Sequence, residues 1–337
     1  MHYFTLDEIL SQTDAWTQAL SVATLAPLPK AADFEQVLFT GCGSAYYLSL
    51  GASALYQELT GRTARAVPAG ELLLNPQIAL PESGERLLLV AVSRSGTTTE
   101  TLRAVGQFRR SGRGPVILIG NYTAALAEQA DISILIEKGR EESVAQTRSF
   151  ASMYVAATVL CARMADRFDL LDAMQALPVA GRSLLRTCEP IARALGEDLT
   201  LDRYYFLGSG IRYGLACEAS LKMKEMSMTH SEPFHILEYR HGPKSLAGPG
   251  ALVVGLLSDK NRTHERAVLD EIKELDARVL SLADTEADIA FESGIPESVR
   301  AILYLPALQL MAFYRSLAKG LNPDRPENLT AVVQLNL

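Results

Sequence analysis

Short aliphatic runs that alternate with longer segments of helical spacing are the feature of this sequence that most constrains its fold. Unbroken runs of this kind are typical of strands buried on both faces of a sheet. The segments between the runs space their apolar residues as helices do, over 44–60, 98–110, 212–228 and 262–275. Strands separated by helices predict a parallel sheet covered on both sides, an α/β fold. The expected strands are QVLFT (36–40), RLLLVAV (86–92), PVILI (115–119), ISILI (132–136), RYYFL (203–207), ALVVGLL (251–257) and RVLSL (278–282).

The second half of the chain repeats the pattern of the first. LFTGCGSAYYLSLGASALYQE (38–58) aligns with YFLGSGIRYGLACEASLKMKE (205–225), and LLLVAVSRSGTTTET (87–101) aligns with LVVGLLSDKNRTHER (252–266). VILIGNYTAALAEQADI similarly parallels VLSLADTEADIAFESGI, and the three pairs occur in the same order. The repeat predicts two doubly wound lobes in tandem, divided near 175–200. Because the second copy reads SDKNRT where the first reads SRSGTT, we expect one lobe to have kept a site that the other gave up.

Composition and charge exclude several classes of protein. The chain has 337 residues, 48% of them hydrophobic, and a net charge of -7, which argues against a surface for nucleic acid. The longest uncharged stretch, 149–162, is too short to span a bilayer, and no signal peptide is apparent at the N-terminus. No His/Asp/Glu cluster has the spacing of metal ligands, so we expect no metal. Four scattered cysteines without a CxxC pair suit a reducing cytoplasm: Cys42, Cys161, Cys188 and Cys217.

Two glycine-rich turns follow expected strands, TGCGSAY and LGSGIRY. The dinucleotide fingerprint requires a third glycine, and Tyr46 and Tyr213 occupy that position in the two copies. The Gly-Lys-Ser/Thr of a nucleotide-triphosphate loop is also missing from these turns. The turns therefore disfavour both a nicotinamide enzyme and an ATPase.

A loop rich in hydroxyl groups follows the strand at 86–92. It reads SRSGTT and leads into a helix, and Gly96 lets the backbone turn closely around a bound group. Hydroxyl groups and the free N–H groups at a helix start can bind a phosphate dianion without a lysine. The alternative is a capping box formed by Thr97 and Glu100, with the other hydroxyls solvated. The candidate phosphate ligands are Ser93, Ser95, Thr97 and Thr98.

Several motifs in matching order give the chain a resemblance to a known family. SRSGTTTET resembles the Ser-x-Ser-Gly-x-Thr signature of the sugar-isomerase (SIS) phosphosugar-binding domain. ACEASLKMKEMSMTHSEPF, EYRHGPKSL and LAKGLNPDRPENL resemble the isomerase half of glucosamine-6-phosphate synthase. The resemblance implies two tandem SIS domains, each a five-stranded parallel sheet between helices. The expected parts are an N-terminal helical segment (1–34), the two domains (35–175 and 185–325) and a tail near the active site (326–337).

The resemblance also implies a phosphate site in the first domain. Arg94 replaces a glutamine of the synthase, and its charge either adds to phosphate binding or faces solvent. ESVAQTRSF (142–150) resembles the loop that closes the pocket with backbone groups, so Val144 and Gln146 are further candidates. That loop looks closer to sugar-phosphate isomerases and deaminases than to the synthase. The residues expected to hold the sugar 6-phosphate are Ser44, Ser93, Ser95 and Thr98.

The catalytic residues implied by the resemblance lie in the second domain. Glu218, Lys222 and Glu225 form one helical stripe, which taken alone indicates a solvated i,i+4 ion pair. In the family, Glu225 aligns with the carboxylate that moves a proton between C1 and C2 of the open-chain sugar, and Lys222 steadies charge on the oxygens. His241 matches the residue that opens the sugar ring and, in relatives, reaches the neighbouring subunit. A homodimer without a cofactor is therefore expected.

Two departures from the synthase shape the expected reaction. The chain begins Met-His-Tyr, so we expect no glutaminase with a cysteine after Met1, and Ala331 stands where the synthase has a Schiff-base lysine. Lys319, twelve residues earlier, is a conceivable substitute. We therefore favour isomerisation with loss of ammonia from an amino-sugar 6-phosphate of gluco or galacto type. Plain aldose–ketose isomerisation and a non-catalytic phosphosugar sensor are the alternatives.

Overall fold

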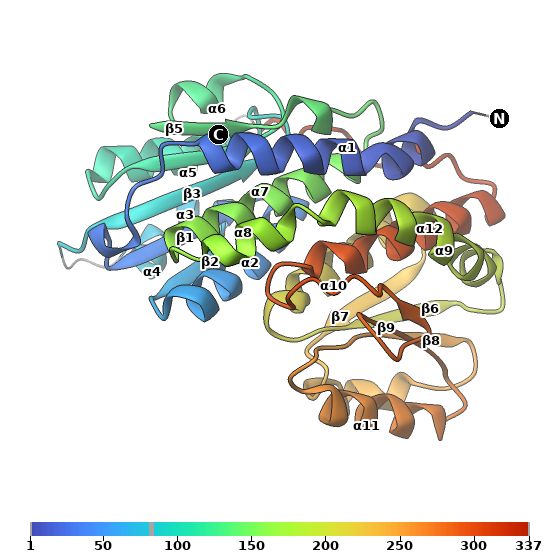
Figure 1. Cartoon of the computed structure of the whole chain (residues 1–337). Helices are drawn as coiled ribbons and strands as arrows, with labels where there is room; N and C mark the ends of the chain where they lie inside the picture. Colours follow the sequence, from blue (N-terminus) through green and yellow to red (C-terminus); the bar gives the residue numbers. More distant parts are fainter. Residues whose placement is uncertain (1, 81–83, 336–337) are drawn as a thin grey trace. The chain divides into compact units, whose positions relative to one another are not determined.

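The computed structural model describes residues 2–80 and 84–335, and its ribbon is drawn in Figure 1. Its backbone divides into two compact units, each made of three separate stretches of chain. The first lobe consists of Asp14–Glu141, Arg148–Gln175 and Thr330–Leu337. The second lobe consists of Met1–Thr13, Glu142–Thr147 and Ala176–Leu329.

The first lobe is built on a parallel five-stranded sheet of order β2-β1-β3-β4-β5. Its strands are β1 (Gln36–Gly41), β2 (Ala64–Pro68), β3 (Leu87–Ser93), β4 (Val116–Gly120) and β5 (Ile132–Leu135). Helix α1 (Phe4–Leu25) begins among the residues of the second lobe and ends in the first. The other helices of the first lobe are α2 (Ser44–Thr60), α3 (Ala69–Leu74), α4 (Pro76–Ala79), α5 (Thr99–Ser111), α6 (Ala125–Glu128), α7 (Arg148–Met164) and α8 (Phe168–Met174).

Helices cover both faces of this first sheet. Every residue of β3 is buried, as expected for a strand that packs on two sides. Leu87 and Leu89 belong to a core cluster on one face that includes Val105 and Phe108 of α5. On the other side α2 contacts β1 and packs against α7. The apolar spacing at 98–110 thus marks the buried stripe of a surface helix.

The second lobe has the same design. Its parallel sheet has the order β10-β9-β8-β6-β7, so β6, β7, β8, β9 and β10 correspond to β1 through β5. The strands are β6 (Arg203–Leu207), β7 (His230–Phe234), β8 (Ala251–Leu256), β9 (Arg278–Ala283) and β10 (Ile289–Ala290). The helices are α9 (Leu177–Glu197), α10 (Tyr213–Ser227), α11 (Arg262–Lys273) and α12 (Leu305–Ala318), and in Figure 1 α11 lies along one face of this sheet. Short 3₁₀ turns occur at Ala31–Asp33, Glu137–Gly139, Gly210–Arg212, Glu238–Arg240, Pro243–Leu246 and Ala301–Tyr304.

The two tandem sheets confirm the predicted fold. All seven expected strands and all four expected helices are present, with ends that shift by at most two residues. The aliphatic pattern did not predict three strands, β2, β7 and β10, and each of them lies at an edge of its sheet. Pro68 and Pro233 lie in β2 and β7, and proline is tolerated at edge strands because it cannot donate to a ladder.

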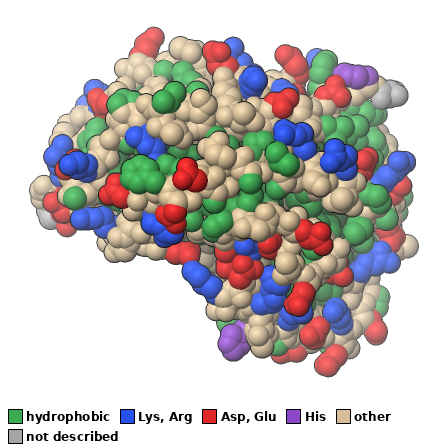
Figure 2. Space-filling model, viewed as in Figure 1, with side chains coloured by type: hydrophobic (Ala, Val, Ile, Leu, Met, Phe, Trp, Pro, Cys, Tyr) green, Lys and Arg blue, Asp and Glu red, His purple; other side chains and the backbone are tan. Residues whose placement is uncertain are grey.

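One stretch, Ala301–Ala318, is long and apolar enough to cross a membrane, but 89% of it is buried inside the protein, as in the core helix of a globular lobe. On the molecular face drawn in Figure 2, acidic and basic side chains are interspersed. That mixture is typical of an ordinary solvated surface.

Candidate active site

The hydroxyl-rich loop lies at the point where the strand order of the first sheet changes direction. From β1 the chain passes to β2 on one side and then to β3 on the other, so β1 and β3 are neighbours whose following loops diverge. Thr40 pairs with Ala91, which places the carboxyl ends of the two strands side by side. Ser44 follows β1, and Ser93 ends β3. Open α/β sheets bind ligands at this switch point.

The glycine turn after β1 brings a helix start close to the sheet. A side chain at Gly41 would put its Cβ 2.6 Å from the Cβ of Ala45 and 2.9 Å from the carbonyl oxygen of Val92, so only glycine fits there. Gly43 has a φ of 55°, a left-handed conformation that favours glycine. Ser44 then opens α2 as a buried residue. The turn therefore sets the N-terminus of a seventeen-residue helix beside β3.

The loop after β3 is shaped by its own hydroxyl groups. The N–H of Gly96 donates to the Oγ of Ser93 at 3.0 Å, and the N–H of Thr97 donates to the Oγ of Ser95 at 3.2 Å. Gly96 has a φ of 66°. Thr98 is the N-cap of α5, and its side chain makes no capping bond. The capping box of Thr97 and Glu100 is therefore wrong, because the hydroxyl of Thr97 lies 3.1 Å from Ser95 instead.

Two helix N-termini, those of α2 and α5, thus follow neighbouring strands. Unpaired N–H groups and the helix dipole make such ends favourable for anions. The described geometry brings Ser44, Ser93, Ser95 and Thr98 to the same edge of the sheet, where the sequence interpretation expects a phosphate to bind. We call these four residues and the backbone of 94–97 the cradle.

Arg94 is buried, so the alternative that it faces solvent is wrong. Its guanidinium lies 3.4 Å from the carboxylate of Glu141, which is also buried, and Nη2 donates to the carbonyl of Ala331 at 2.9 Å. Further along the tail, the N–H of Leu335 donates to the hydroxyl of Thr99 at 3.0 Å. The end of the chain therefore lies against the loop that carries the cradle, while residues 336 and 337 of the expected tail fall outside the described part.

The ESVAQT loop belongs to the second lobe and is fastened by an acidic residue of α1. The carboxylate of Glu8 accepts the N–H groups of Glu142 at 2.6 Å and Ser143 at 3.2 Å, together with the hydroxyl of Ser143. The N–H of Val144 donates to the carbonyl of Asp324 at 3.0 Å. Gln146 is half-buried on the same loop. The backbone amides of 142–144 are thus engaged within the protein.

The stripe of Glu218, Lys222 and Glu225 on α10 is a buried cluster, so the solvated ion-pair interpretation is wrong. The Nζ of Lys222 lies 3.3 Å from the carboxylate of Glu218 and also donates to Glu225. The side chains of Lys222 and Glu218 are 1% and 0% exposed, whereas Glu225 keeps 20% of its surface. Burial lowers the pKa of Lys222, but the carboxylates of Glu218 and Glu225 outweigh burial and raise it above the ordinary value. Lys222 is therefore a charged ammonium beside a carboxylate that solvent can reach.

Lys319 fastens the end of the same helix. Its Nζ donates to the carbonyl of Ser227 at 2.6 Å, to the carbonyl of Met228 at 3.1 Å and to the hydroxyl of Thr229 at 3.3 Å. Met228 caps α10 in a left-handed conformation with a φ of 48°. A cation at this place satisfies carbonyls that a helix end leaves unpaired. Lys319 is thus a helix cap, which speaks against its use as the Schiff-base amine.

His241 lies in the stretch between β7 and β8. It follows a 3₁₀ turn after β7 and is exposed, and within residues 2–80 and 84–335 its imidazole has no hydrogen-bond or ion-pair partner. His235 instead stacks on Tyr213 with ring centroids 3.8 Å apart, and His230 lies 3.4 Å from Glu232.

The sequence interpretation missed the two acidic residues that hold the loops. Glu8 and Glu141 are separated from their partners by many residues, and neither belongs to a motif. Glu141 accepts the N–H of Ser149 at 2.9 Å as well as pairing with Arg94. The only available signal was the acidic run at 141–142. No group of three metal-binding side chains occurs in the described ranges.

Comparison with known proteins identifies relatives over almost the whole chain. The model of the SIS domain family matches residues 32–163 and 201–314. Glutamine–fructose-6-phosphate aminotransferase (isomerizing) of Pyrococcus horikoshii is 30% identical over 98% of this chain and 57% of its own length. The same enzyme of Methanothermobacter thermautotrophicus is 27% identical over the same shares. The chain thus spans little more than half the length of these curated relatives.

Solved structures show the same fold. Glucosamine-6-phosphate deaminase of Thermotoga maritima has 28% identity and a TM-score of 0.80, covering 98% of this chain and 99% of that one. Tagatose-6-phosphate ketose/aldose isomerase of Escherichia coli has 23% identity and a TM-score of 0.84, covering 96% and 95%. The second likeness concerns the fold alone.

Proposed function

Because the chain belongs to the SIS-domain family, we propose that it is an enzyme that isomerises an amino-sugar 6-phosphate and releases its amine as ammonia. The sugar is of the glucosamine or galactosamine 6-phosphate type. The glucosamine-6-phosphate deaminase of Thermotoga maritima is 28% identical and matches along nearly the whole of both chains, which supports this reaction. Ala331 supports it too, because the chain carries no amine where the synthase forms a Schiff base.

The observation that carries the proposal is the buried position of Lys222 between two carboxylates. Placing the charged Lys222 and Glu218 side chains almost wholly out of water, with Glu225 only partly exposed beside them, costs folding free energy. A phosphosugar sensor needs the cradle but has no use for this cluster. Perturbed, desolvated charges are typical of catalytic sites, which favours an enzyme over a sensor.

The proposed chemistry assigns one end of the substrate to the cradle. The hydroxyls of Ser44, Ser93, Ser95 and Thr98 donate to the phosphate oxygens, and the α2 and α5 N-termini add their positive ends. Arg94, paired with Glu141, positions the loop and contributes positive charge next to it. Val144 and Gln146 remain candidates for closing the site around the phosphate.

At the other end of the substrate, Glu225 moves a proton between two carbons. It takes the proton from C2 of the open-chain aldose, which leaves an enolamine across C1 and C2, and returns the proton to C1. Lys222 stabilises negative charge that develops on the C1 oxygen. Water then adds to the resulting C2 imine, and ammonia leaves as the C2 carbonyl forms. The products are a ketose 6-phosphate and ammonia, so atoms and charge balance.

We further propose a cytoplasmic homodimer in which His241 of one subunit serves the neighbouring subunit. Its exposed imidazole is suited to protonating a ring oxygen brought to it from outside its own chain.

The experiment is a substrate screen of the wild type, Glu225→Gln and the control Glu274→Gln. Glu274 is an exposed glutamate at the end of α11, and its substitution removes the same charge outside the site. Glucosamine, galactosamine and fructose 6-phosphates are supplied, and ammonia, new sugar phosphates and exchange of the C2 proton with solvent are measured. Glu225→Gln should lose at least about 10³-fold in turnover and lose C2 exchange, while Glu274→Gln matches the wild type.

Each result of the screen selects one function. Ammonia together with a ketose phosphate supports the deaminase, and new sugar phosphates without ammonia support a plain isomerase. Thermal stabilisation by these sugars without conversion of any of them would point to the sensor. Persistent C2 exchange in Glu225→Gln would overturn the role of Glu225.

A further inference from the structure

The second lobe keeps the framework of the cradle at its own switch point. β6 and β8 are neighbours there, as β1 and β3 are in the first lobe. The N–H of Asn261 donates to the Oγ of Ser258 at 2.9 Å, just as Gly96 donates to Ser93 at 3.0 Å. The loop after β8 thus repeats this one N–H to hydroxyl bond, although Asn261 has a φ of -114° where Gly96 has 66°.

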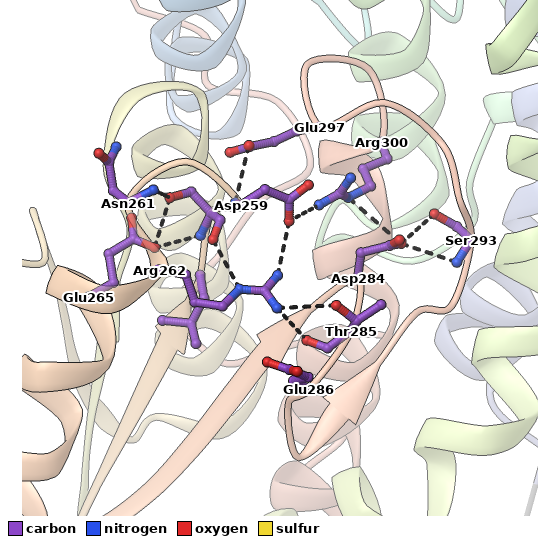
Figure 3. Close-up of polar contacts among 12 residues, drawn as sticks. Asp259, Asn261, Arg262, Glu265, Asp284, Thr285, Glu286, Ser293, Glu297 and Arg300 are labelled. Atoms are coloured by element: carbon purple, nitrogen blue, oxygen red, sulfur yellow. Dashed lines mark hydrogen bonds and ion pairs between the residues drawn. The ribbon is translucent and has the colours of Figure 1, made fainter.

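A carboxylate occupies this second switch point. Glu297 follows β10, and its Oε1 accepts Nη1 of Arg212 at 2.6 Å. Its Oε2 accepts the N–H of Asp259 at 3.1 Å, a contact drawn in Figure 3. Arg212 follows β6, and Asp259 follows β8. Loops after three strands therefore meet at one pair of carboxylate oxygens.

The position of Glu297 in the repeat indicates how this arrangement arose. The loop after β10 reads ESV at 297–299, and the loop after β5 reads ESV at 142–144. Glu142 of the first copy is exposed, whereas the side chain of Glu297 is only 15% exposed. The same residue in corresponding loops is thus exposed in the first copy of the repeat and largely buried in the second.

Two buried arginines lie at this switch point: Arg212 pairs with Glu297 and lies 3.7 Å from Glu265, and Arg300 pairs with Asp259 and Asp284. Arg212 and Arg300 are 5% and 3% exposed. Arg300 donates to Asp259 at 2.6 Å and to the carbonyl of Ile295 at 2.9 Å, and Figure 3 shows its guanidinium between Asp259 and Asp284. The Nε of Arg212 has no hydrogen-bond partner among the described residues. Two guanidiniums at this depth require anionic partners.

We propose that the second lobe retains an anion-binding site whose ligand is its own Glu297, so that this carboxylate takes the place of a phosphate. A guanidinium and a loop N–H that converge on two oxygens are the donors that a phosphate or sulfate would use. The chain therefore offers one site to an external sugar phosphate, in the first lobe, and the second site accepts an oxyanion only when Glu297 is removed.

The test is the response of Glu297→Ala to inorganic phosphate, with the wild type and Glu274→Ala as controls. Glu274→Ala removes one carboxylate of the same lobe from an exposed helix end. Thermal unfolding is followed as phosphate is raised at constant ionic strength. Glu297→Ala should gain at least about 3 °C in Tm beyond the phosphate response of the wild type. Glu274→Ala should follow the wild type.

Every outcome decides the proposal. If Glu297→Ala responds to phosphate no more than Glu274→Ala does, the proposal is wrong. Should Glu297→Ala fail to fold, Glu297→Ser keeps an acceptor for the N–H of Asp259 and is tested in its place. If both variants refold only when phosphate or sulfate is present, that dependence supports the proposal. If phosphate does not improve their refolding, the proposal is contradicted. In the wild type only the cradle of the first lobe is open to phosphate, so the rise of its Tm with phosphate measures that site alone. A wild type that does not respond would count against the proposed function without deciding the role of Glu297.

Discussion

At the scale of single residues, burial decides what a charged side chain can do. Lys222 and Lys224 lie two positions apart on α10, yet Lys222 is 1% exposed and Lys224 faces solvent. The Nζ of Lys224 donates to the hydroxyl of Ser220, whereas Lys222 meets two carboxylates. A buried ion pair is far more costly to break than a surface contact. The two lysines therefore form a matched pair for mutation.

Replacing Lys222 by methionine should lower the free energy of unfolding by about 3–5 kcal/mol, because it removes the ammonium that faces the fully buried Glu218. Lys224→Met should cost less than about 1 kcal/mol. The double variant Glu218→Gln/Lys222→Met should recover at least about 1 kcal/mol of the loss and stay inactive. Urea unfolding and ammonia release measure the two effects. Equal stability losses in Lys222→Met and the double variant would show that the Glu218–Lys222 pair does not couple.

Residue types and their spacing predicted part of the candidate site. The i, i+4, i+7 spacing placed Glu218, Lys222 and Glu225 on one stripe, which the structure confirms. Spacing alone does not report burial, so the stripe taken alone indicated a solvated ion pair. Glu8 and Glu141 could not be found, because Glu8 holds residues 142–143 and Glu141 pairs with Arg94, both far away in the sequence.

At the scale of elements, the aliphatic runs predicted the central strands and failed at the edges. A central strand is covered on both faces and must be apolar throughout, which makes it visible in the sequence. β7 reads HSEPF and lies at an edge, where polar residues and proline are tolerated. The capping box failed for a related reason. The hydroxyl of Thr97 bonds Ser95 within the loop, and no sequence pattern distinguishes that bond from a cap.

The polar network after β8 should make the second lobe sensitive to acid. Burial raises the pKa of Asp259, but the guanidinium of Arg300, with Arg262 and Arg212, lowers it below the ordinary value. A carboxylate with a depressed pKa in the folded state contributes stability above its unfolded pKa of about 3.9 and loses that stability as the pH falls through the folded pKa.

We therefore expect Asp259→Asn to flatten the fall of the urea midpoint as the pH drops below about 4. Asp276→Asn serves as the control, because Asp276 is exposed and asparagine tolerates its φ of 60°. Circular dichroism of urea titrations at several pH values gives the midpoints. If the urea midpoint of Asp259→Asn falls with pH as steeply as that of Asp276→Asn, Asp259 does not contribute to the acid sensitivity.

At the scale of the whole molecule, the proposed dimer makes each site depend on two chains. Glu225→Gln and His241→Ala should both be inactive alone. When they are unfolded together and refolded at equal concentrations, hybrid dimers should regain one complete site each, which gives about a quarter of the wild-type activity. A mixture of Glu225→Gln with Glu225→Ala is the control and should regain none. If the first mixture stays as inactive as the control, His241 does not act across a dimer.

The two lobes are interleaved along the chain. The first needs Thr330–Leu337, and the second needs Met1–Thr13 and Glu142–Thr147. During synthesis on the ribosome, the first sheet and its helices emerge by residue 175, but Ala331, which meets Arg94, follows the whole second sheet in the chain. The first half must therefore wait, with this place uncovered, until residue 331 has been made. Cutting the gene between the repeats would separate each half from pieces that complete the other, so the half that carries the cradle is not a portable module.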